Sequence, residues 1–139
     1  MKPDPALVLN QIGGRLLFEI GPALAPGYGQ GSAGTMGVLL IMAAQECERA
    51  ASLRVAENRA LRAWLREAAE GFEAADLPEP SVDIQALDAE GARLKQALIQ
   101  AQIRLEARLP DPAAQALLLR SYDLLAEASR RRRIHLPPF

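Results

Sequence analysis

The sequence is poor in the residues that build active sites, metal sites and disulfide frameworks. It has one cysteine, one histidine and 4% aromatic residues in 139 positions. Cys47 cannot form an internal disulfide, so we interpret it as a small buried hydrophobic residue in a reducing, cytoplasmic setting. His135 follows the last predicted helix, and a serine or cysteine triad would depend on it alone. We therefore predict no catalytic residues.

Side chains that could bind a metal ion are equally scarce. Di-iron bundles use Glu-x-x-His pairs on facing helices, and the sequence contains no such pair. A zinc site would need more cysteine or histidine ligands. We expect no metal ion and no cofactor.

Excess charge and long apolar runs are also missing. The formal net charge of -1 gives no overall attraction to nucleic acid or to anionic lipid. The longest apolar helical run is about nine residues, whereas a bilayer needs about 20. No secretory signal is visible either. We expect a protein that does not enter a membrane and that its net charge does not direct to nucleic acid.

The most informative shortage is local, because no charged residue occurs between Ile20 and Gln45 in a chain that is 24% charged. Such a segment is expected to avoid water as core, as a subunit interface or as the wall of a ligand site. We prefer a homodimer interface. Its predicted residues are Met36, Val38, Leu39, Leu40, Ile41 and Met42.

Half of the residues are hydrophobic, mostly alanine and leucine, which favours helices over strands. We predict one all-α domain over residues 1–139, with helices at about 5–20, 35–70, 82–108 and 112–133. Asp4-Pro5 and Asp111-Pro112 are typical of helix starts, and Ser81 is the predicted cap of the third helix. Short connections imply antiparallel neighbours, so the predicted architecture is an antiparallel up-down four-helix bundle with one overlong helix.

Helical spacing predicts which face of each helix is buried. The first helix is expected to bury Leu9, Ile12, Leu16 and Ile20. The second is expected to bury Leu61, Trp64, Leu65, Ala68 and Phe72, and the third Ile84, Leu87, Gly91, Leu94, Leu98, Ala101 and Leu105.

A glycine-rich motif precedes the predicted second helix. Residues 29–34 fit the pattern G-x-G-x-x-G, but a helix and two prolines precede them instead of a strand, so a dinucleotide site is not expected. We interpret the motif as a turn-rich connection capped by Ser32 or Thr35. The alternative is an anion site at a helix start, which would bind acyl-CoA or phosphate. Its candidate residues are Gly29, Gly31, Ser32, Gly34, Thr35 and Arg49.

Two stretches of the sequence are rich in charged residues that would need partners in a folded protein. Residues 45–62 hold a dense polar cluster, for which pairing of these side chains with one another or with neighbouring helices is the favoured interpretation. Alternatively, Arg15, Arg49 and Arg54 could converge on a ligand.

Residues 130–133 are four arginines, and residues 67–92 hold eight acids and no Lys or Arg. We expect these two runs to pair with each other. Nucleic-acid association through the arginines is the alternative.

Two stretches, Leu17 to Leu24 and Val55 to Leu65, carry a resemblance to a known family. They are similar to small helical bacterial proteins of unknown function that are often encoded beside acyl-CoA dehydrogenases. The resemblance covers about residues 7–70 and implies an acyl-CoA enzyme, or its substrate, as a partner. It implies no catalytic residue.

These observations together predict a non-catalytic helical interaction or accessory protein that forms a homodimer. A small anionic-ligand binder or enzyme that uses the glycine-rich loop and the bundle arginines is the second hypothesis. Nucleic-acid association is the third.

Overall fold

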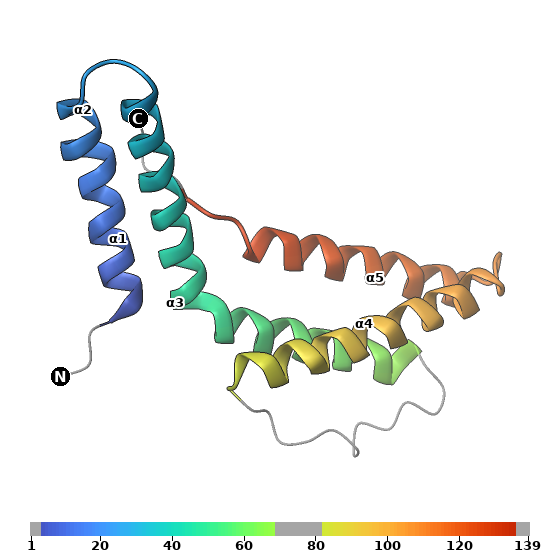
Figure 1. The fold of residues 1–139 in the computed structure, drawn as a ribbon. Coiled ribbons are helices and arrows are strands. Elements are labelled where there is room, and N and C mark those ends of the chain that lie inside the picture. Colours follow the sequence, from blue (N-terminus) through green and yellow to red (C-terminus); the bar gives the residue numbers. More distant parts are fainter. Residues whose placement is uncertain (1–3, 69–81, 136–139) are drawn as a thin grey trace. The chain divides into compact units, whose positions relative to one another are not determined.

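The chain is helical throughout the part that the structure describes, which comprises residues 4–68 and 82–135 of a computed structural model (Figure 1). Four helical stretches and no strand occur in these ranges, so the all-α prediction is confirmed. The chain divides into a unit formed by residues 1–50 with 134–139 and a unit formed by residues 51–133. We call them the hairpin unit and the three-helix unit. The predicted single domain concerns independent folding and stays a prediction.

The hairpin unit is an antiparallel pair of helical stretches. The first consists of α1 (Pro5–Arg15), the π-helix η1 (Leu16–Ile20) and α2 (Gly21–Ala23), and the second is the beginning of α3 (Tyr28–Ala68) (Figure 1). As predicted, Asp4 caps α1 by accepting hydrogen bonds from the Ala6 and Leu7 N–H groups. The stretch continues three residues beyond its predicted end, because Pro22 occupies the first turn of α2, where a missing N–H is tolerated.

Glycine brings the two stretches into backbone contact. A Cβ atom on Gly13 would lie 2.7 Å from the Gly37 carbonyl oxygen, and one on Gly37 would lie 2.8 Å from the Gly13 carbonyl oxygen. Small residues therefore form much of the face of α3 that meets α1, namely Ala33, Gly37 and Ala44, together with Ile41.

The predicted buried face of the first helix is therefore wrong in part. Ile12 is 47% exposed and Ile20 is 42% exposed, whereas Gly13 is buried. Two helices that touch through glycine leave no room for large side chains between them, so these side chains lie on the flanks. Cys47, predicted to be buried, is exposed because it lies beyond the last of the small residues that meet α1.

Helix α3 begins at Tyr28, seven residues before its predicted start. The glycine-rich residues 29–34 are therefore helical and do not form the predicted turn-rich connection. Gly27, with a φ of 148°, takes a conformation that favours glycine and lets the helix begin directly after it. Thr35 does not cap a helix, since its hydroxyl donates to the Gly31 carbonyl oxygen one turn earlier.

The three-helix unit contains the end of α3 together with α4 (Ile84–Glu106) and α5 (Pro112–Arg131). Asp83, rather than Ser81, caps α4, and Ser81 lies outside the described residues. Asp111 caps α5 as predicted. The core consists of Leu61, Trp64, Leu65, Leu94, Leu98, Ala101, Leu105 and Ala114.

This core largely confirms the predicted faces of the second and third helices. Leu87 and Gly91 are buried as predicted, whereas Ile84 is 36% exposed at the first residue of α4. Phe72 lies outside the described residues.

Helices α3 and α4 run in the same direction, and α5 runs against them (Figure 1). Arg54 pairs with Asp88 and Arg62 pairs with Glu90, so residues later in α3 contact residues later in α4, as in a parallel pair of helices. The predicted up-down order is therefore not observed for this pair. Of the residues between Ala68 and Ile84, numbers 69–81 lie outside the described residues. No helix in the two described ranges has the length and apolarity to cross a bilayer.

We predict that Gly37→Ala lowers the free energy of unfolding by about 1–3 kcal/mol, because the added methyl group meets the Gly13 backbone. Gly34→Ala is the matched control in the same helix, since nothing lies within 4 Å of its Cβ position. This control should stabilise the protein by about 0.5–1 kcal/mol through helix propensity. Urea unfolding followed by circular dichroism measures both, and changes of the same sign would contradict the glycine contact.

Candidate functional site

The predicted anion site is not assembled. The Gly31 N–H donates to the Gly27 carbonyl oxygen at 3.2 Å, so the N–H groups of the motif from Gly31 onward are used within the helix. Arg49 lies fourteen residues beyond Thr35 on the same helix, about 21 Å away along its axis. The structure therefore does not bring the glycine-rich residues and Arg49 together.

The other arginines proposed for convergence have local partners. Arg15 pairs with Glu19 on its own helical stretch at 3.2 Å, and Arg54 pairs with Asp88 on α4 at 2.7 Å. Nor do three His, Cys, Asp or Glu side chains in the described ranges lie close enough together to hold a metal ion.

The polar cluster of α3 forms a series of contacts with α4 and with the end of α5. Asn58 donates to the Leu87 carbonyl oxygen at 3.0 Å, and Arg62 pairs with Glu90. Glu57, whose side chain is 9% exposed, accepts two hydrogen bonds from Arg132, at 2.5 and 2.8 Å. Structural pairing, the favoured interpretation of this cluster, is confirmed for these residues.

Three of the four arginines at residues 130–133 pair with acidic side chains in the structure. Arg130 and Arg131 both pair with Glu127, and Arg132 pairs with Glu57. None of these partners belongs to the acidic run at residues 67–92, and the part of that run from 70 to 79 lies outside the described residues. Of these contacts, the Arg132–Glu57 pair joins the end of α5 to α3.

Within the hairpin unit, His135 is held to α3 by two hydrogen bonds. The Gln45 side chain donates to the His135 carbonyl oxygen at 2.6 Å and accepts a hydrogen bond from the His135 N–H at 2.9 Å. The His135 backbone is thus bound twice, while the residue as a whole is exposed. No sequence signal indicates this contact, because it joins residues 90 positions apart.

The predicted interface residues separate according to the face of α3. Met36 is 52% exposed and Leu39 is 56% exposed, whereas Ile41 is buried on the face that meets α1. Val38, Leu40 and Met42 are intermediate. One face of α3 in the uncharged segment therefore packs against α1, and another face leaves apolar side chains exposed.

Residues of α1 extend this uncovered surface. Ile12 directly precedes Gly13, and Met36 directly precedes Gly37, so in an antiparallel pair that touches at these glycines both lie on the same side. Val8 is one turn from Ile12 and 41% exposed. We call Val8, Ile12, Met36 and Leu39 the apolar flank. Nearby exposed apolar residues of the same unit are Leu7, Phe18, Ile20, Leu24 and Tyr28, the last 92% exposed.

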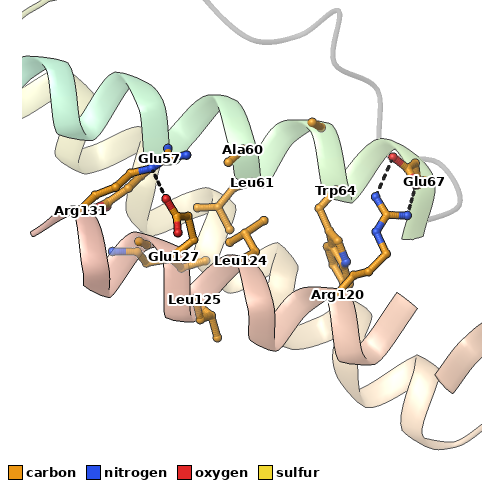
Figure 2. A pocket seen from close by; sticks show the side chains of 13 residues that line it. Glu57, Ala60, Leu61, Trp64, Glu67, Arg120, Leu124, Leu125, Glu127 and Arg131 are labelled. Carbon is orange, nitrogen blue, oxygen red and sulfur yellow. Dashed lines mark hydrogen bonds and ion pairs between the residues drawn. The ribbon is translucent and has the colours of Figure 1, made fainter. Parts of the chain in front are cut away.

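The three-helix unit carries a groove of about 340 Å³ between α3 and α5 (Figure 2). Leu61, Trp64 and Leu124 contribute apolar surface to it, and the Trp64 indole N–H donates to the Leu117 carbonyl oxygen.

Ion pairs lie at both ends of this groove (Figure 2). Arg120 donates two hydrogen bonds to Glu67, at 2.6 and 3.2 Å, and these lower the pKa of Glu67. At the other end, hydrogen bonds from Arg130 and Arg131 lower the pKa of Glu127. These acids are thus balanced by neighbouring arginines, and the groove offers mainly apolar surface.

Comparison of the chain with protein-family models, with curated proteins and with solved structures gave no match. The resemblance to the small bacterial proteins stays a prediction. A function must therefore be argued from the surfaces of the chain itself.

We predict that Arg132→Ala lowers the free energy of unfolding by about 1–2 kcal/mol, because it leaves the nearly buried Glu57 carboxylate without its two charged hydrogen bonds. Arg130→Ala removes the same charge from a pair in which both side chains are exposed, so its unfolding curve should match that of the wild type. Urea unfolding compares the two. Equal stability of both variants would show that the Glu57 contact does not hold α5 to α3.

Proposed function

We propose that this chain is a helical interaction protein that forms a homodimer through the apolar flank of its hairpin unit. The observation that carries the proposal is the exposure of Val8, Ile12, Met36 and Leu39, which is between 41% and 56%. Contiguous apolar surface of this kind typically marks an interaction site.

The hairpin unit cannot cover this flank itself. Its helices meet through Gly13 and Gly37, so the large side chains that would fill a core in a more widely spaced pair lie outside the contact. Covering them removes apolar area from water at about 25 cal/mol per Å². A dimer interface of standard size buries about 800 Å² on each partner, which exceeds four side chains and would draw in neighbouring exposed residues.

A second copy is the partner that fits this surface best. No charged residue lies between Ile20 and Gln45, so this segment has no charge with which to select a charged partner. A two-fold contact needs a surface that matches itself, and an uncharged apolar flank does so without like-charge repulsion. Two hairpins packed in this way would place four helices together between two chains, which differs from the four-helix bundle within one chain that the sequence predicted.

We predict that the wild-type protein sediments as a dimer at micromolar concentration and that Met36→Glu/Leu39→Glu sediments as a monomer. Two carboxylates buried without partners should weaken association by at least about 100-fold. The matched control is Ile99→Glu/Ile103→Glu, which places the same charges at positions of α4 that are 47% and 53% exposed.

The control should remain a dimer. A monomeric wild type, or a flank variant that dimerises as well as the control, would contradict the proposal.

A further inference from the structure

The three-helix unit has a second pocket, and three arginines are among the residues that line it. A pocket of about 360 Å³ lies between α3 and the start of α4, and Arg59, Arg62 and Arg66 line it together with Asn58 and Glu90. We call it the arginine pocket. Glu90 is the one acid among the described residues that line it, so positive charge predominates among them.

That one acid already has a partner. Arg62 pairs with Glu90, and both side chains are largely buried, with exposures of 18% and 11%. Arg59 and Arg66, as well as Arg93 on α4, form neither an ion pair nor a side-chain hydrogen bond within the part of the chain that the structure describes. Among the described residues, three guanidinium groups near one salt bridge therefore have no ion-pair partner.

The unpaired charges act on Arg62. Burial lowers the pKa of the Arg62 guanidinium, and the charges of Arg93 and Arg66 lower it further. The Arg62 Nε atom is moreover buried and has no hydrogen-bond partner among the described residues. Like charges held this close repel one another, and a bound anion would offset that repulsion.

The spacing of the arginines indicates the size of such an anion. Positions 59, 62 and 66 follow helical spacing and lie on one face of α3, over about 10 Å of its length. A planar guanidinium group can donate two parallel hydrogen bonds to one phosphate or carboxylate group. A row of this length suits a ligand with more than one phosphate group better than a single small ion.

We propose that the arginine pocket binds a small phosphate-bearing molecule with at least two negative charges, held by Arg59 and Arg66 beside the Arg62–Glu90 pair. This site lies in the three-helix unit and goes beyond the proposed dimer. A nucleic-acid backbone presents the same phosphate chemistry, but it requires phosphate contacts spread along a surface, whereas these arginines line a pocket.

Pyrophosphate is the probe that tests the proposal. We expect calorimetric titration at low salt to show binding to the full-length wild type. Arg59→Gln/Arg66→Gln should weaken that binding by at least about tenfold, since it removes two charged donors. The matched control, Arg104→Gln/Arg108→Gln, removes one exposed arginine near the end of α4 and one just beyond it, where Arg108 forms an exposed pair with Asp111. It should change the affinity by less than about twofold, because solvent and salt screen distant charges.

Stability supplies a second readout that a purely structural role would not give. Without ligand, Arg59→Gln/Arg66→Gln should melt at or above the wild-type temperature, because a source of repulsion has gone. Pyrophosphate should raise the melting temperature of the wild type and of the control, but not that of this variant. The flank variant Met36→Glu/Leu39→Glu should bind pyrophosphate like the wild type, so failure of the dimer and failure of the pocket are distinguishable.

Three results would overturn the proposal. The first is a wild type that binds no pyrophosphate at low salt. The second is a control that loses as much affinity as the pocket variant, which would show a general charge effect. The third is tighter binding of a short DNA duplex than of pyrophosphate through the same two arginines, which would assign the phosphate chemistry to a nucleic acid.

Discussion

The contact between the backbones of Gly13 and Gly37 determines how the uncharged segment is used. Because a Cβ atom at either position would lie within 2.8 Å of the opposite carbonyl oxygen, the two helical stretches meet without large side chains between them. Ile41 and small residues complete this contact, and Ile12, Met36 and Leu39 remain on its flank. A surface for a partner thus follows directly from how closely the helices pack.

The kind of side chain that helix α3 uses to contact its neighbours changes along its length. In its first part it meets α1 through small apolar residues, and its later part combines a leucine core with polar contacts at Arg54, Glu57, Asn58 and Arg62. Buried charges cost free energy unless they are paired, and Glu57 and Arg62 each have an oppositely charged partner. Arg59 and Arg66 follow the same helix into a pocket where no acid pairs with them, which separates the proposed phosphate site from the purely structural pairs.

The sequence predicted those features of the fold that depend on local chemistry. Asp4 and Asp111 cap helices as expected, and the seam from Leu87 to Leu105 is buried, because caps and helical spacing act within a few residues. Features that depend on contacts between distant residues were not predicted. The contact of Gly13 with Gly37 joins residues 24 positions apart, and the direction of α4 is likewise set by contacts with a distant part of α3.

For the candidate sites too, the sequence indicated local patterns but not the contacts between distant residues. The uncharged segment indicated residues that would avoid water, but separating the buried Ile41 from the exposed Met36 and Leu39 required the position of α1. The spacing of Arg59, Arg62 and Arg66 was visible in the sequence, whereas the position of Arg93 and the pairing of Glu90 depend on α4.

The central claim, that a second chain covers the apolar flank, is tested most directly by cysteine accessibility. Cys47 is the single cysteine, so Cys47→Ser gives a background in which Met36→Cys or Ile103→Cys reports on one position. The account predicts that maleimide modification of Met36→Cys slows at least about tenfold as the protein concentration passes through the dimerisation range, while that of Ile103→Cys stays constant. Equal modification rates for both positions at all concentrations would contradict it.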